Sequence, residues 1–127
     1  MIFHDSMRDA VGQVIDKLVE AVGAVRAVVV SSEDGFELVS RASDKSHVSR
    51  LSAMASSMTA LGAMAGEECK IGDFRSITLE AEEGFILLLQ ARRPDGNLIL
   101  SVIAESKAII GQVLFYSKRA AEQLQQV

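Results

Sequence analysis

The 127-residue sequence contains no tryptophan, one cysteine and one proline, and aromatic residues make up only 5% of it. A single cysteine excludes an internal disulfide framework and is typical of proteins from a reducing compartment. Small-molecule pockets are lined mainly by apolar and aromatic side chains, so the shortage of aromatics disfavours a ligand-sensing function. These absences favour an assembly module over a protein built around a pocket.

The chain also has no block of basic residues. Its formal net charge is −4, which argues against nucleic acid or an anionic membrane as the main partner. The start, Met1 to Asp5, has neither the basic nor the apolar region of a signal peptide. The uncharged stretch from Leu51 to Gly66 is shorter than the roughly 18 to 20 residues that a membrane span needs. We therefore expect a cytoplasmic protein with no nucleic-acid partner and no membrane insertion.

Motifs of nucleotide and metal chemistry are missing as well. No G-x-x-x-x-G-K-S/T loop is present, so the chain is not itself a GTPase, and no G-x-G-x-x-G follows a strand. His4 and His47 have no metal-ligand spacing to each other or to a cysteine. Cys69 follows two glutamates at a helix C-terminus, where the electrostatics disfavour the thiolate. We expect no catalytic, cofactor or metal site, and therefore no enzyme.

Two charged clusters fall at turns. The three glutamates of segment 80–83 are interpreted as a solvated turn, because nothing in the sequence separates their environments into an acid and a base. Arg92-Arg93 leaves two alternatives open. The pair either contacts an acidic partner, for example as an arginine supplied to a GTPase in trans, or keeps a hairpin end soluble with Asp95 as a local partner. We favour the hairpin end.

What is present is a regular succession of apolar segments and turn signals. Hydrophobic residues make up 49% of the chain, enough for a core within one domain over residues 1–127. The predicted order is helix, two strands, helix, three strands, helix. The predicted ranges are 6–22, 25–31, 36–41, 44–69, 74–80, 85–91, 98–104 and 106–124. The predicted N-caps are Asp5 or Ser6, Asp44 or Ser46, and Ser106.

The strands are predicted to form one antiparallel sheet, because short turns join them within each group. Strands 25–31, 85–91 and 98–104 are apolar on successive residues, so both of their faces should be covered and they should be central. Strands 36–41 and 74–80 mix polar and apolar residues and should be edges. The simplest strand order is 2-1-5-4-3 in an α+β fold with helices on both faces.

The helix over residues 44–69 is the most informative segment, because neither of its faces is charged between Leu51 and Gly66. One face is predicted to pack on the sheet: Val48, Leu51, Met54, Ala55, Met58, Gly62 and Ala65. The opposite face consists mainly of small residues: Ser49, Ala53, Ser56, Ser57, Ala60 and Met64. Small side chains let another backbone approach closely, as the G-x-x-x-G spacing of Gly62 and Gly66 also indicates. We predict that the sheet buries one face and a second copy or a partner buries the other.

We therefore predict a dimer interface. Its helix residues are Ala53, Ser56, Ser57, Ala60 and Met64. Pairing the edge strand 74–80 with its copy would extend the sheet and satisfy its open hydrogen-bonding groups, which adds Arg75, Ile77 and Leu79. Met54 and Met58 are assigned to the core, because methionine at helical spacing is more often core than docking surface.

Four segments carry a resemblance to a known family, and the resemblance covers almost the whole chain. They are the strand and turn Val25–Gly35, the small-residue helix Leu51–Gly62, the Gly84-Phe85 start of an apolar strand, and Leu98–Ala104 leading into Ile109-Ile110-Gly111. In this order and spacing they resemble the Roadblock family, which is related to the dynein light chains of that name and to bacterial regulators of Ras-like GTPases.

The resemblance implies a profilin-like, five-stranded sheet between helices. It also implies a homodimer, or a heterodimer with another roadblock chain, formed by the long helix and the strand after it. The implied role is to bind and regulate a small Ras-like GTPase, with activation of its hydrolysis as one form. The alternatives are a scaffold for a motor or signalling complex and, least favoured, a small-ligand sensor.

Overall fold

Residues 4–127, which the computed structural model describes, form three helices and five strands. They are α1 (Asp5–Ala21), β1 (Val25–Ser32), β2 (Glu37–Ala42), α2 (Val48–Glu68), β3 (Ser76–Ala81), β4 (Gly84–Ala91), β5 (Leu98–Glu105) and α3 (Ile110–Leu124). Residues 1–3, part of the segment in which no signal peptide is predicted, lie outside the described residues.

The strands form one sheet in the order β2-β1-β5-β4-β3, and all neighbouring pairs are antiparallel. Three hairpins, β1–β2, β3–β4 and β4–β5, follow from the short turns, and β5 pairs with both β4 and β1. The predicted α+β class, element order and strand order are therefore confirmed. The central strands β1, β4 and β5 are the three with continuous apolar runs.

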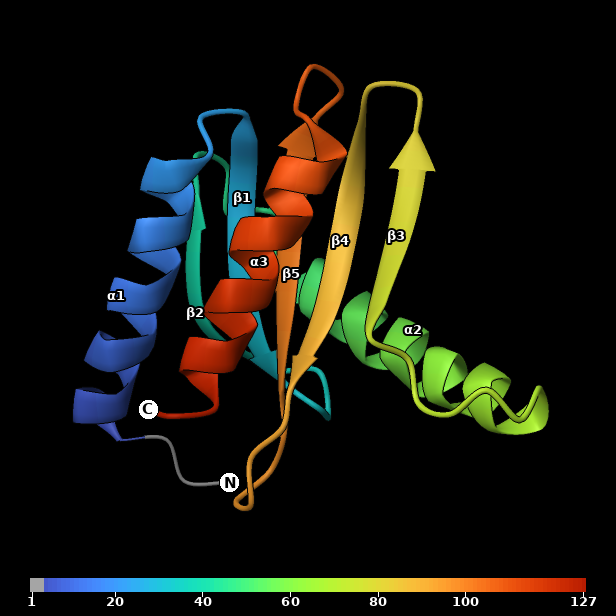
Figure 1. Cartoon of the computed structure of the whole chain (residues 1–127). Coiled ribbons are helices and arrows are strands. Elements are labelled where there is room, and N and C mark those ends of the chain that lie inside the picture. The colour runs from blue at the N-terminus through green and yellow to red at the C-terminus, as the bar shows by residue number, and fades with distance from the viewer. Residues whose placement is uncertain (1–3) are drawn as a thin grey trace.

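Helices α1 and α3 cover one face of the sheet and enclose the main hydrophobic core (Figure 1). Side chains alternate between the two faces of a strand, so every second residue of the central strands enters this core. The strand residues include Val28, Val30, Leu87, Leu89, Leu100 and Val102, and those from the helices include Val11, Ile15, Leu18, Val113 and Leu124. Each fully buried side chain of this kind contributes about 1.5 to 3 kcal/mol, so this face supplies most of the apolar stabilisation.

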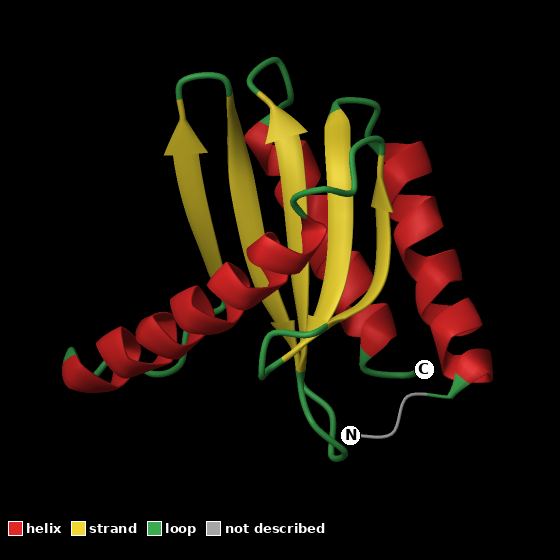
Figure 2. Ribbon diagram, turned by 180° about the vertical axis from the view of Figure 1, so that it is seen from behind, coloured by secondary structure: helices red, strands yellow, loops and turns green. Residues whose placement is uncertain are grey.

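Helix α2 crosses the other face diagonally and continues past the β3 edge (Figure 2). Its apolar contacts with the sheet form two small clusters, Val29–Val48–Leu51 and Ala55–Leu88–Ile99. The strand register places Ser31 and Ser101 on this same face. Their buried hydroxyls have no hydrogen-bond partner within residues 4–127. The contact between α2 and the sheet is therefore smaller and more polar than the core on the opposite face.

The start of α2 differs from its prediction. The helix begins at Val48, with His47 at the N-cap position and no capping side chain. Asp44 does not cap the helix, because its carboxylate accepts a hydrogen bond from the Ser46 N–H at 2.9 Å and so forms a turn. At the other end, Cys69 is the C-cap rather than the last helical residue.

The other two helices also begin at residues different from those predicted. Helix α1 begins at Asp5 after His4, and neither Asp5 nor Ser6 caps it. Helix α3 begins at Ile110, because Ser106 lies in a turn that follows β5. Serine and aspartate favour turns as well as N-caps, and the turns are the conformations found here.

Two strands begin later than predicted. Phe36 precedes β2, in the turn after β1, and is 68% exposed. Phe74 and Arg75 precede β3. The other three strands each extend by one residue beyond the predicted range. These shifts leave the predicted strand order unchanged.

Candidate protein interface

The outer face of α2 is exposed along most of its length. Ala53, Ser57, Ala60 and Met64, four of the five helix residues assigned to an interface, lie at the surface. Met64 is 64% exposed, and its neighbour Leu61 is 63% exposed. A contiguous, uncharged and partly apolar helix face in water is typical of an interaction surface.

The buried face of α2 is rotated relative to the prediction. Met54 and Ala65 were expected in the core but are exposed, and Ser52 and Thr59 are buried instead. Their hydroxyls donate to backbone carbonyls four residues earlier, at 2.9 Å, so the polar atoms are satisfied within the helix. The assignment of Met54 was wrong for this reason. Met58 is half-buried and packs against the second apolar cluster, as predicted.

Ser56 is placed differently from the other assigned interface residues. Its hydroxyl donates to the Glu33 carbonyl in the turn between β1 and β2. In the same turn Gly35 has φ +95°, and a Cβ at this glycine would lie 3.3 Å from the Ala53 Cα. The small residues of α2 therefore admit the chain's own hairpin at this point. The assignment of the helix face to a dimer stays a prediction.

Strand β3 leaves one side of the sheet open. It pairs with β4 alone among the strands of residues 4–127, and Thr78 to Ala81 are exposed. Ile77 packs toward α2, whereas Leu79 is 44% exposed and continues the apolar surface beyond the helix. Arg75 is exposed and lies just before the strand. The strand thus offers unpaired backbone groups together with an accessible apolar side chain.

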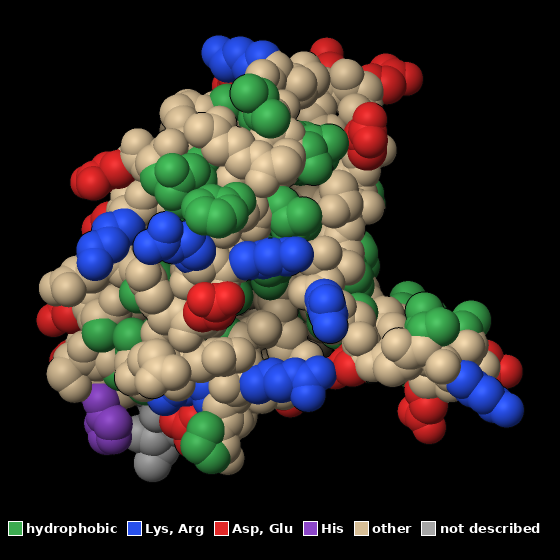
Figure 3. Space-filling model, in the orientation of Figure 1, with side chains coloured by type: hydrophobic (Ala, Val, Ile, Leu, Met, Phe, Trp, Pro, Cys, Tyr) green, Lys and Arg blue, Asp and Glu red, His purple; other side chains and the backbone are tan. Residues whose placement is uncertain are grey.

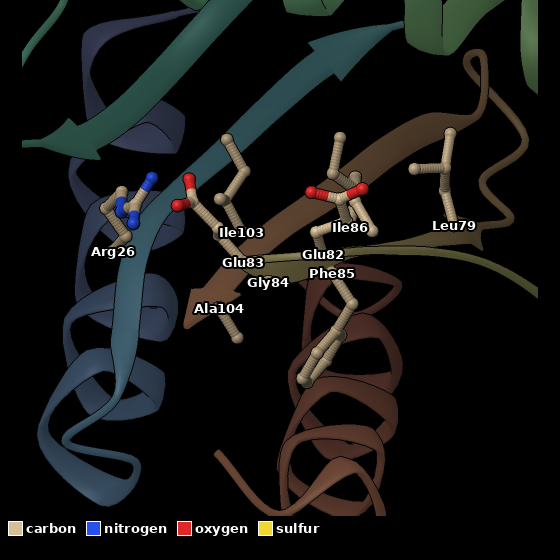
Figure 4. Close-up of a pocket in the computed structure, with 10 residues that line it drawn as sticks. Arg26, Leu79, Glu82, Glu83, Gly84, Phe85, Ile86, Ile103 and Ala104 are labelled. Atoms are coloured by element: carbon tan, nitrogen blue, oxygen red, sulfur yellow. The ribbon is translucent and has the colours of Figure 1, made fainter. Parts of the chain in front are cut away.

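A groove of about 440 Å³ opens on the part of the sheet that α2 leaves uncovered (Figure 4). Leu79, Ile86 and Ile103, from three neighbouring strands, form its floor. Arg26 and the turn residues 82–83 form its rim. An apolar centre within a charged rim is the usual anatomy of a protein interface.

A second hollow continues this groove toward the start of α2. It shares Arg26 and Ile103 with the groove and also includes Asp44 and His47. The backbone N–H of Ser46 lowers the pKa of Asp44, and the His47 Nε2 lies 3.7 Å from the Asp44 carboxylate. The His47 side chain is exposed and lies at the second hollow, beside the groove.

The described residues offer little support for a metal site or a reactive thiol. Residues 4–127 contain no group of three His, Cys, Asp or Glu side chains arranged to hold a metal ion. Cys69 is exposed at the C-cap of α2. Over the same residues, no helix is long and apolar enough to cross a membrane.

The Arg92-Arg93 pair has a structural role that the sequence indicates only in part. Arg93 pairs with Asp95 at 3.0 Å, as predicted, and its hydrogen bond lowers the pKa of that carboxyl. However, the Arg93 side chain is only 9% exposed, and its Nη1 donates to the Leu124 carbonyl at 2.8 Å. Arg92 pairs with Asp73 at 2.6 Å. Arg93 therefore joins the β4–β5 turn to the end of α3, a contact that no local sequence signal reveals.

The fold and this surface together define a profilin-like α+β module whose β3 edge is unpaired within residues 4–127. The chain belongs to the Roadblock/LC7 domain family, whose model matches residues 12–104. The match extends from α1 through β5 and includes α2 and β3. A search of curated proteins finds no matching sequence.

Several solved structures share the fold at low sequence identity. MglB in a tetrameric arrangement has a TM-score of 0.88 and 18% identity, over 99% of this chain and 93% of that one. A Roadblock/LC7 domain from Streptomyces avermitilis has a TM-score of 0.81 and 22% identity, over 90% and 93%. LokiProfilin1, solved with rabbit actin, has a TM-score of 0.60 and 14% identity, over 92% and 98%. These similarities confirm the fold, including its likeness to profilin.

Proposed function

We propose that this chain is a non-enzymatic, cytoplasmic dimer that binds and regulates a small Ras-like GTPase. The observation that carries the proposal is the combination of an uncharged outer α2 face with an unpaired β3 edge. Both surfaces are exposed in a single copy, and the association of two copies through β3 would cover both. Membership of the Roadblock family supports a GTPase as the partner, since that family is related to bacterial regulators of such proteins.

The arrangement of α2 and β3 supports a two-fold dimer. Figure 2 shows α2 passing the β3 edge near the end of the sheet where β3 begins. The groove lined by Leu79 and Ile86 lies near the other end, where β3 finishes. Antiparallel pairing of two β3 strands turns one copy end over end, so the projecting α2 of each copy lies over the groove of the other. Leu61 and Met64 then meet an apolar floor.

Regulation would follow from different affinity for the two nucleotide states of the GTPase, because a ligand shifts an equilibrium only through such a difference. The chain has no phosphate-binding loop and no free arginine in the Arg92-Arg93 turn, where one side chain is buried and the other is ion-paired. Any activation would therefore act by ordering the GTPase's own catalytic groups.

The deciding experiment is a titration of the candidate GTPase, loaded separately with GDP and with a non-hydrolysable GTP analogue. The proposal expects tighter binding of one nucleotide state and no GTP hydrolysis by the chain alone. Equal affinity for both states would make a scaffold the better account. Absence of binding, together with saturable uptake of a small molecule into the groove beside Arg26, would favour a ligand sensor.

A further inference from the structure

The face formed by α1 and α3 carries a second exposed surface, on the opposite side of the sheet from α2. Apolar side chains gather over the first part of α3, and Lys and Arg side chains form a row below them (Figure 3). Ile109, Ile110 and Phe115 are 69%, 40% and 54% exposed. We name these three residues the α3 shelf. No dimer formed through α2 and β3 would cover them.

The basic row consists of Lys17 on α1, Lys118 and Arg119 on α3, and Arg75 before β3. None of these four cations has an ion-pair partner within residues 4–127. The chain as a whole is acidic, with 17 Asp and Glu against 13 Lys and Arg. Four unpaired cations thus lie beside the shelf, although Glu122 also lies nearby.

Two hollows place these cations on either side of α3. One hollow, of about 230 Å³, lies between α1 and α3 and has Lys17 and Arg119 on its sides, with no carboxylate in its lining. The other, of about 370 Å³, separates α3 from the β3–β4 edge and contains Arg75 and Lys118. Both hollows can admit side chains from a segment that crosses α3.

Phe115 links the shelf to the row. Its ring packs edge-on against Tyr116, with 5.2 Å between centroids, and the Arg119 guanidinium lies 5.7 Å from the Phe115 ring centroid. The cation–π contact orients both groups. An exposed aromatic ring held in place loses little entropy when a partner covers it, as in many binding hot spots.

We propose that the α3 shelf and the basic row form a docking site for an acidic segment of another protein, one that carries apolar side chains among its Asp and Glu residues. Charge complementarity and the apolar shelf define that chemistry. A flat anionic membrane fits less well, because the cations lie at hollows beside α3 rather than on a projecting loop. The site does not depend on the proposed GTPase function, since the shelf, Lys17, Lys118 and Arg119 lie on the α1–α3 face. Only Arg75, at the start of β3, also belongs to the predicted dimer interface.

The test is fluorescence anisotropy with a labelled peptide of Glu, Leu and Phe, compared with the same peptide in which Gln replaces Glu. We expect saturable binding of the acidic peptide and none of the neutral one. The double variant Lys118→Glu and Arg119→Glu should weaken binding by about tenfold, because each exposed charge pair contributes a few-fold at most. Phe115→Ala should weaken it several-fold through the lost apolar contact.

Lys45→Glu is the matched control, because this exposed lysine lies in the loop after β2 and away from α3. It should bind the acidic peptide as the wild type does. Circular dichroism and sedimentation establish that every variant keeps the wild-type fold and mass. Absence of saturable binding, equal loss in Lys45→Glu, or stronger capture by phosphatidylserine vesicles than by the peptide would overturn the proposal.

Discussion

The two edge strands of the sheet, β2 and β3, differ in whether side chains cover their outer backbone groups. At the β2 edge, Arg8 donates from Nη1 to the Leu38 carbonyl, and Arg41 donates to the Ser40 carbonyl while pairing with Asp16 of α1 at 2.7 Å. At the β3 edge no comparable side chain caps the strand within the described residues, and α2 projects past it. Exposed edges template further pairing unless they are covered or charged. The chain therefore blocks one edge and leaves the other available.

The largest effect should come from a charge on the outer face of α2. Ala60→Glu would place a carboxylate on the helix face that the second copy is predicted to cover, and an unpaired buried charge is destabilising by about 3 to 5 kcal/mol. Sedimentation should then show a monomer where the wild type shows a dimer. Gln13→Glu adds the same charge to the exposed face of α1 and should not change the mass. A dimeric Ala60→Glu variant of unchanged stability would show that this face remains in water.

A smaller effect is expected at the open edge itself. Leu79→Lys should weaken the dimer by about 1 to 2 kcal/mol, because it replaces a half-exposed apolar side chain with a charge on the strand that pairs. The dissociation constant from a sedimentation dilution series measures this change. If Leu79→Lys and wild type dissociate at the same concentration, β3 does not form the interface.

At the closed edge we expect a loss of stability without a loss of association. Arg41→Ala removes the ion pair with Asp16, and both side chains are about half exposed, at 43% and 48%. The free energy of unfolding should therefore fall by only about 1 kcal/mol in urea titration. The dimer dissociation constant should not move. A change comparable to that of Leu79→Lys would abolish the distinction between the two edges.

The smallest effect concerns the turn that joins β1 to β2. A hydrogen bond from the Ser32 hydroxyl lowers the pKa of Asp34 below its usual 3.8. The ionised Asp34 therefore stabilises the folded chain fully at a pH above the pKa of Asp34 in the unfolded chain. This stabilisation disappears as the pH falls through the lower pKa of Asp34 in the folded chain. Asp34→Asn should slightly reduce stability at pH 7 and should lose less stability than wild type on acidification. A steeper acid loss in the variant would contradict this assignment.

The strand order could be predicted because the sequence of each strand indicates whether one or both of its faces are buried. The continuous apolar runs of β1, β4 and β5 identify central strands, and the mixed runs of β2 and β3 identify edges. The closure of the β2 edge could not be predicted in the same way. It depends on Arg8 and Arg41 meeting backbone and carboxylate groups 25 or 30 residues away.

For the candidate interface, the sequence did not predict which residues of α2 are buried. Between Leu51 and Gly66 every face of α2 is uncharged, so hydrophobic periodicity predicts poorly which face packs on the sheet. Ser52 and Thr59 are buried there, whereas Met54 is exposed. Nothing in the sequence distinguishes the exposed Ile109 and Ile110 from the buried Val113 on the same segment. Serine that bonds its own helix backbone is compatible with burial, and that compatibility is invisible in a hydrophobicity pattern.

The thin, partly polar contact beneath α2 has a consequence for hydrogen exchange. Ser31 and Ser101 contribute no paired hydroxyl there, and the two apolar clusters are small. Local opening free energies follow such differences in packing, so amide protons of α2 should exchange with deuterium well before those of β5. A second copy lying across the helix would slow that exchange, and protection confined to α2 and β3 would report association even in a mixture of partners.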